Sequence, residues 1–132
     1  MSTILFAEYV KLNKGQLWTC DIDARNIRNA SRFLKDYNLH ANLIVSDSLN
    51  FLEDFNETID VLYLDSHDGN LPGANEHQLR EAQISLNKIN SNGLIMLDDK
   101  GKKTELSIPF LISEGWEIIF ESENQVIFQK AD

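Results

Sequence analysis

Cysteine, proline and glycine are scarce in this sequence. The 132 residues include one cysteine, Cys20, with two prolines and six glycines. A single cysteine excludes an internal disulfide framework and agrees with a reducing compartment, and so little proline and glycine excludes a collagen-like or linker-rich chain. The sequence also has no apolar run near the ~20 residues that span a bilayer, and no basic and apolar leader at its start. We therefore expect a soluble, cytoplasmic protein without a membrane partner.

Positive charge is scarce as well. Twelve Lys and Arg stand against 21 Asp and Glu, which gives a formal net charge of -9 at pH 7. Such a surface repels the phosphate backbone of nucleic acid, so we expect no nucleic-acid partner. The 42% hydrophobic and 25% charged residues are ordinary for a globular protein. A chain of this length can bury one core, and we expect a single domain over residues 1–132.

Predicted helices and strands alternate along the chain. Apolar residues recur three or four apart in residues 24–37 and 75–89, which predicts amphipathic helices. In the second of these helices we expect one apolar face, made of Leu79, Ala82, Leu86 and Ile89. In chain order, we expect a helix over 2–12 (residue types that also suit a strand), a strand over 16–23, a helix over 24–37, a strand over 41–46, a helix over 49–55, a strand over 59–65, a helix over 75–89, a turn at Asn92-Gly93, a strand over 94–97, a helix over 106–114 and strands over 116–121 and 125–129. The predicted fold class is α/β, with a mostly parallel sheet, an antiparallel C-terminal hairpin and helices on both faces.

Acidic and polar residues follow every strand of the predicted parallel sheet. They are Asp21 and Asp23, then Asp47 and Ser48, then Asp65 and His67, then Asp98, Asp99 and Lys100. Ligands of open α/β sheets bind beyond the carboxyl ends of the strands, so these residues mark the expected site. Helix capping accounts for a single Asp or Ser at such a turn. It accounts less well for a carboxylate at every strand end, because converging like charges repel.

The residue types after the first two strands suit a nucleoside. A carboxylate at a strand end, such as Asp21, can accept two hydrogen bonds from a ribose diol. Asp47 and Ser48 are placed to contact the edge of an adenine ring.

The residue types after the later strands suit acid, base or metal chemistry. Asp65 with Asp98 or Asp99 offers the oxygen ligands that Mg²⁺ prefers. His67 offers a base or a ligand, although a lone loop histidine is more often solvated or a helix cap.

Four segments in this order and at these distances carry a resemblance to a known family. Residues 17–23, 45–49, 59–66 and 92–99 resemble the corresponding strand ends of the class I S-adenosylmethionine-dependent methyltransferases. Within that superfamily they are most similar to the small branch near the catechol O-methyltransferases and the cephalosporin-hydroxylase-like proteins. The resemblance covers nearly the whole chain, including the terminal hairpin. It implies a Rossmann-like methyltransferase sheet and S-adenosylmethionine as cofactor.

The resemblance also implies residue roles. It assigns ribose binding to Asp21, adenine packing to Ile22 and adenine-edge contacts to Asp47 and Ser48. Asp65 is also a predicted cofactor-binding residue. In metal-using members the later acidic groups match Asp65, Asp98 and Asp99. Those enzymes carry Asn at the next position, where this chain has Lys100, and a lysine ammonium can neutralise the same carboxylates without Mg²⁺. His67, Asp99 and Lys100 are the predicted catalytic residues.

One part of the family pattern is not found in the sequence. Members begin with a strand and a glycine-rich loop that approaches the methionine part of the cofactor, whereas here Ser2 and Thr3 match the cap of the helix that follows. We therefore expect an N-terminally truncated version of the fold. A homodimer that exchanges a segment is one way to fill the place of the missing strand.

Three functions remain open at this point. The first is a methyltransferase that acts on an oxygen or nitrogen of a small-molecule acceptor. The second is a non-catalytic, degenerate methyltransferase-fold module that self-associates. The third is a phosphoacceptor receiver domain, which the late position of Asp98, Asp99 and Lys100 disfavours.

Overall fold

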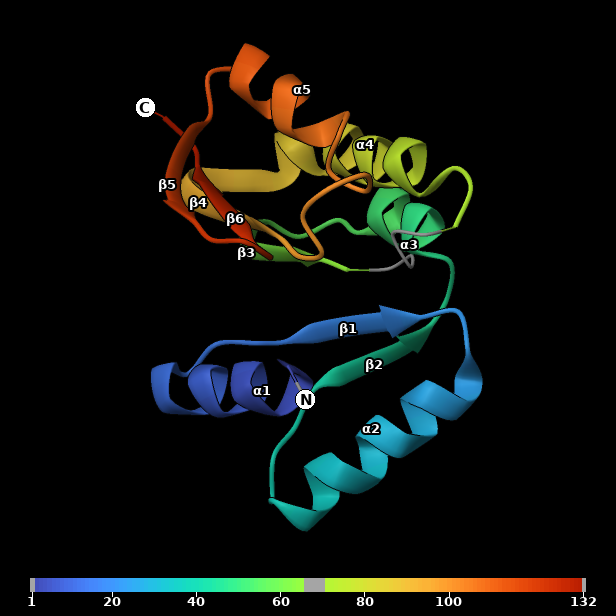
Figure 1. Cartoon of the computed structure of the whole chain (residues 1–132). Coiled ribbons are helices and arrows are strands. Elements are labelled where there is room, and N and C mark those ends of the chain that lie inside the picture. The colour runs from blue at the N-terminus through green and yellow to red at the C-terminus, as the bar shows by residue number, and fades with distance from the viewer. Residues whose placement is uncertain (1, 66–70, 132) are drawn as a thin grey trace. The chain divides into compact units, whose positions relative to one another are not determined.

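Helices and strands alternate along the chain in the predicted order (Figure 1). The structure is a computed structural model that describes residues 2–65 and 71–131. Its elements are α1 (Ser2–Asn13), β1 (Trp18–Asp21), α2 (Ala24–Asp36), β2 (Asn42–Val45), α3 (Ser48–Asp54), β3 (Ile59–Leu64), α4 (Ala74–Ser85), the short 3-10 helix η1 (Leu86–Lys88), β4 (Ile89–Leu97), α5 (Ser107–Ser113), β5 (Glu117–Glu121) and β6 (Val126–Gln129). The chain divides into two compact units, unit 1 (Met1–Phe51) and unit 2 (Leu52–Asp132), and each is described by itself. The expectation of a single domain stays a prediction.

Unit 1 is built on a parallel pair of strands. β1 and β2 pair in register from Trp18 opposite Asn42 to Asp21 opposite Val45. α1 and α2 pack against each other through Ala7, Leu34 and Leu39, which form a small buried core. The opening segment is therefore a helix and not a strand.

Unit 2 contains a four-stranded sheet in the order β3-β4-β6-β5. β3 and β4 are parallel, while β6 is antiparallel to both β4 and β5, which confirms the predicted C-terminal hairpin. The core of this unit is larger than that of unit 1, and it consists of Leu64, Ile89, Ile95, Leu97, Leu111, Trp116, Val126 and Phe128. α5 begins two residues before Pro109, where the ring is tolerated because the first turn needs no backbone donor.

β4 differs from its prediction at the N-terminal end. The strand begins at Ile89, and Asn92-Gly93 lies inside it instead of forming a separate turn. Asn92 has a positive φ of 64°, and the pairing between β3 and β4 shifts register between Ile59 and Val61. The Asn-Gly pair thus forms an irregularity within a continuous strand, because the strand on either side of it pairs with β3.

The buried face of α4 is the clearest departure from the sequence prediction. Periodicity placed Leu79, Ala82, Leu86 and Ile89 on that face, but only Ala82 of these is a buried residue of α4. The other buried residues of the helix are Ala74 and three polar ones, Gln78, Glu81 and Ser85. Two of the polar side chains make hydrogen bonds that permit burial: Ser107 Oγ donates to Gln78 Oε1, and Ser85 Oγ donates to the Glu81 carbonyl over 2.8 Å.

The fold is α/β, with parallel strand pairs, an added antiparallel hairpin and a Rossmann-like order of elements. None of the described helices is long and apolar enough to cross a membrane.

Candidate functional site

In unit 1, the carboxyl ends of β1 and β2 bring the first two predicted groups to one edge. The last ladder pair is Asp21 opposite Val45, and the Ser46 amide extends the pairing by donating to the Asp21 carbonyl over 3.1 Å. Asp47 follows at once and Ser48 opens α3. The parallel register therefore places Asp21, Asp47 and Ser48 at the same edge of this two-stranded sheet.

The Asp21 carboxylate is held in a fixed orientation. Its Oδ1 accepts from the Asp23 amide over 2.8 Å, and its Oδ2 accepts from Asn26 Nδ2 over 3.1 Å. An ionised carboxylate has about four acceptor positions, two on each oxygen. Each Asp21 oxygen therefore has one acceptor position left for a ligand. Two adjacent hydroxyl groups are the kind of donor pair that such a carboxylate can bind.

Asp23 has a structural role. It caps α2 by accepting from the Arg25 amide over 2.9 Å, and it forms an ion pair with the Arg25 guanidinium over 2.8 Å. These hydrogen bonds stabilise the ionised form and lower the pKa of Asp23 to about 2. The capping interpretation is therefore correct for Asp23, which leaves Asp21 as the carboxylate available to a ligand.

The side chain of Ile22 lies between these two acidic residues and is 75% exposed. An exposed large apolar side chain at a strand end offers a flat ring a surface to pack on. At the neighbouring strand end, the Asp47 carbonyl accepts from the Phe51 amide over 3.0 Å and from Ser46 Oγ over 2.9 Å, which fixes the start of α3. This edge thus presents an oriented Asp21 carboxylate beside an exposed apolar side chain.

In unit 2, the parallel ends of β3 and β4 form a second polar edge. Leu64 is opposite Leu97, so Asp65 and Asp98 follow neighbouring strands, and the Asp98 amide donates to the Leu64 carbonyl over 3.4 Å. Tyr63 Oη donates to Asp98 Oδ2 over 2.9 Å. Burial, the hydrogen bond to Asp98 and the charge of Asp65 all raise the pKa of Tyr63 well above its ordinary value. The phenol therefore stays a hydrogen-bond donor that orients Asp98.

The lysine that balances Asp65 is Lys103. Its side chain is 1% exposed, and its Nζ lies 3.0 Å from Asp65 Oδ1. The predicted candidate, Lys100, instead forms an ion pair with Glu121 and donates to the Ser122 carbonyl over 3.4 Å. Lys100 thus ties its loop to the β5–β6 hairpin, and the expectation that it neutralises the strand-end carboxylates is corrected in favour of Lys103.

Among the described residues, the predicted metal ligands Asp65, Asp98 and Asp99 do not form a metal-binding group. No cluster of three or more His, Cys, Asp or Glu side chains suited to a metal ion occurs in residues 2–65 and 71–131. Asp99 is exposed and has a positive φ of 56°, while the charge on Asp65 is already balanced by Lys103. The described residues therefore do not favour a divalent cation at this edge. His67 lies outside the described residues.

Sequence reasoning missed Tyr63 and Lys103. Tyr63 lies within a predicted strand, where an aromatic residue is ordinary, but its place two residues before Asp65 was a usable signal. Side chains two apart in a strand share one face, so a polar aromatic group there was bound to lie near the strand end. Lys103 offered no such signal, because its burial depends on packing around a loop.

Comparison with known proteins supports the fold. No protein of curated function matches this chain in sequence. The chain is similar to the structure of the O-methyltransferase NovP, with a TM-score of 0.75, 14% identity, and coverage of 98% of this chain and 67% of that one. A Streptococcus mutans protein described as a methyltransferase, solved in complex with SAH, gives a TM-score of 0.64, 12% identity and coverage of 88% and 76%.

An rRNA methylase from Streptococcus thermophilus is also similar, with a TM-score of 0.64, 16% identity and coverage of 89% of this chain and 74% of that one. Its presence among the neighbours means that the exclusion of nucleic acid, which rested on net charge alone, is not supported. Residues 1–100 match a family described as a methyltransferase domain. The match spans most of the chain, and the chain therefore belongs to this methyltransferase family.

Proposed function

We propose that this protein is an S-adenosylmethionine-dependent methyltransferase that acts on an oxygen or nitrogen of a small acceptor. The observation that carries the proposal is the exposed Ile22 beside the oriented Asp21 carboxylate at the edge of unit 1. Asp47 and Ser48 complete the adenosine-binding group. Family membership and the SAH complex of the S. mutans neighbour support this choice of cofactor.

When bound, the cofactor supplies a methyl group on a positively charged sulfur. In unit 1, Asp21 accepts hydrogen bonds from the ribose hydroxyls, and Ile22 shields one face of the adenine from water. This binding fixes the position of the methyl donor. Much of the rate enhancement in such a transfer comes from alignment of the reacting groups.

In unit 2, we assign acceptor activation to Asp98. Tyr63 holds Asp98 Oδ2, so Oδ1 is the atom that takes the proton from the acceptor O–H or N–H. Asp98 would thus hold the proton that an acceptor O–H or N–H loses when it is methylated. Asp65, held by Lys103, is the second carboxylate and accepts a hydrogen bond from the acceptor. Asp99 and Lys100, although predicted to be catalytic, have no role in this proposed mechanism.

The charge of unit 2 bears on the choice of acceptor. Residues 52–132 contain 16 Asp and Glu against six Lys and Arg, whereas residues 1–51 contain five against six. A strongly acidic unit repels an RNA backbone and attracts cationic molecules, and it does not repel neutral ones. This distribution favours a small acceptor over RNA.

Calorimetry with SAH tests the cofactor assignment. We expect wild type to bind, Asp21→Ala to lose affinity about tenfold because a charge-assisted hydrogen-bond pair is removed, and Asp36→Ala to bind as wild type. Asp36 is the matched control, since it is an exposed carboxylate at the other end of α2. Absence of heat at millimolar SAH, or equal loss in both variants, contradicts the proposal. A stable dimer that ignores SAH, measured by light scattering, would instead favour the non-catalytic module.

A further inference from the structure

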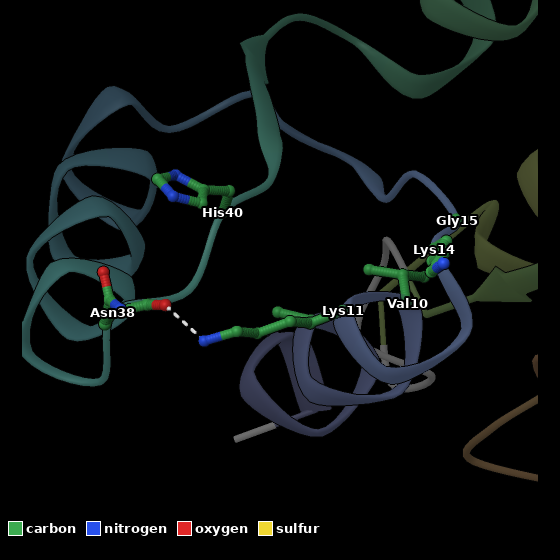
Figure 2. A pocket seen from close by; sticks show the side chains of 7 residues that line it. Val10, Lys11, Lys14, Gly15, Asn38 and His40 are labelled. Carbon is green, nitrogen blue, oxygen red and sulfur yellow. Dashed lines mark hydrogen bonds between the residues drawn. The ribbon is translucent and has the colours of Figure 1, made fainter.

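A pocket lies at the opposite edge of unit 1 from Asp21 and Asp47. It has a volume of about 340 Å³, and its lining includes Val10, Lys11, Lys14, Gly15, Asn38 and His40 (Figure 2). Gly15 precedes β1 and His40 precedes β2 in the chain. Because the two strands are parallel, this pocket is at their amino ends, whereas the proposed cofactor site is at their carboxyl ends.

The lining of this pocket is basic although the chain is acidic. It includes two lysines and a histidine and no carboxylate, in a chain with a formal net charge of -9. A concave surface lined by groups of one charge sign raises the local concentration of ligands with the opposite sign. The pocket therefore favours an anion.

Lys14 occupies a backbone position at which glycine is the usual residue. Its φ is 58°, and the Gly15 amide donates to the Val10 carbonyl over 2.8 Å, which is the hydrogen bond that closes a helix through a left-handed residue. A lysine there strains the backbone where glycine would not. In the described part of the chain, the Lys14 ammonium has neither an ion pair nor a hydrogen bond. Lys14 is exposed, so its ammonium is open to solvent and to a ligand.

Lys11 connects α1 to the other side of the pocket. Its Nζ donates to the Asn38 carbonyl over 3.2 Å, at the end of α2, as the dashed line in Figure 2 shows. Lys11 thus balances the partial negative charge of the α2 carboxyl end. Lys14 makes no such bond, so its charge remains available to a ligand.

We propose that this pocket binds a small ligand through a phosphate or carboxylate group, held by Lys14 and His40 beside the fixed Lys11. The cavity is at the lower end of the size range of small-molecule sites. The site is distinct from the proposed cofactor site and does not depend on methyl transfer.

NMR titration of the full chain tests this site. The probes are inorganic phosphate, acetate and, as a neutral reference, glycerol, and the readouts are the His40 ring protons and the backbone amides of residues 11–15. We expect saturable shifts with phosphate or acetate, none with glycerol, and weaker binding as salt is raised. Comparison of phosphate with acetate at equal ionic strength identifies the preferred group.

Four variants separate binding from folding. We expect Lys14→Gln to weaken binding about fivefold, Lys14→Arg to retain it, and Lys35→Gln, an exposed lysine that does not line the pocket, to leave it unchanged. Lys14→Gly should raise the unfolding temperature by relieving the left-handed strain and should still lose binding. Equal affinity in wild type and Lys14→Gln overturns the proposal. The absence of a saturable shift up to about 50 mM phosphate or acetate also overturns it, because binding weaker than this would be too weak to be useful.

Discussion

At the residue scale, Asp65 and Lys103 form an unequal ion pair. The Lys103 side chain is 1% exposed and that of Asp65 is 44% exposed. Burying a charge is costly unless a partner compensates it, whereas an exposed carboxylate keeps much of its hydration. The two members of the pair should therefore differ in what their removal does to the fold.

We predict that Asp65→Asn destabilises the fold by about 2 kcal/mol, because it leaves a buried ammonium without its counter-charge. This loss is smaller than that for a fully buried pair, because Asp65 is partly exposed. Lys103→Met should cost less than about 1 kcal/mol, since the carboxylate that remains is partly solvated. Urea unfolding measures both values, with Lys102→Met, at an exposed neighbouring lysine, as the control. A larger loss for Lys103→Met than for Asp65→Asn would contradict this interpretation of the pair.

Tyr63 gives a second prediction at this scale. Its pKa is raised in the folded state by burial and by Asp98, so the phenol stays protonated in the fold after it would ionise in the unfolded chain. The stability that it contributes is complete below about pH 10 and is lost as pH rises toward the folded-state pKa. The ultraviolet difference spectrum between wild type and Tyr63→Phe should show no phenolate at pH 10. Half-ionisation at pH 10 in the folded protein would refute the burial and the Asp98 hydrogen bond.

At the element scale, β4 depends on Gly93. A Cβ atom at this position would lie 2.4 Å from Ile89 Cγ2 and 2.7 Å from the Asn90 carbonyl oxygen, well inside contact distance. We predict that Gly93→Ala destabilises unit 2 by about 2 kcal/mol, as overpacking of a closed site does. Gly15→Ala is the matched control, because its Cβ would meet Val10 at an ordinary 3.6 Å. Chemical denaturation of both variants measures the difference, and equal stabilities would show that β4 can adjust around the new methyl group.

The sequence predicted the elements far better than their faces. Each helix and strand is where periodicity and residue type placed it, with shifts at the ends. The predicted buried face of α4 was wrong in part because Gln78 is buried, where its Oε1 accepts a hydrogen bond from Ser107, a residue 29 positions away. Burial of a polar side chain depends on such a distant partner, and no local pattern shows it.

The same limit applies to the candidate site. Asp21, Asp47, Asp65 and Asp98 were predicted because a general rule places ligands at the carboxyl ends of parallel strands, and their roles stay predictions. Lys103 was missed in favour of Lys100, three positions earlier in the same loop. Which of two loop lysines turns inward is decided by tertiary packing, which local sequence does not encode.

At the scale of the whole molecule, the two units differ in what stabilises them. Unit 1 has three buried apolar residues in its core cluster and a two-stranded sheet, while unit 2 has eight such residues and four strands. Two-stranded sheets are marginally stable unless a helix covers them. Local opening should therefore be easier in unit 1 than in unit 2.

Hydrogen exchange of the full chain tests this expectation. We predict that the amides of β1 and β2 exchange faster than those of β4 and β6, because fewer buried apolar contacts oppose their opening. SAH should slow exchange in β1 and β2, since a ligand that binds only the folded form stabilises it by about 2.7 kcal/mol at a concentration of 100 times Kd. Asp21→Ala should reduce this protection to about 1.4 kcal/mol at the same SAH concentration, because its affinity is about tenfold lower, and Asp36→Ala should retain it in full. Equal exchange in the two units without ligand would show that the small core of unit 1 does not limit its stability. Protection by SAH that is as large in Asp21→Ala as in wild type would contradict a cofactor site at this edge of the sheet.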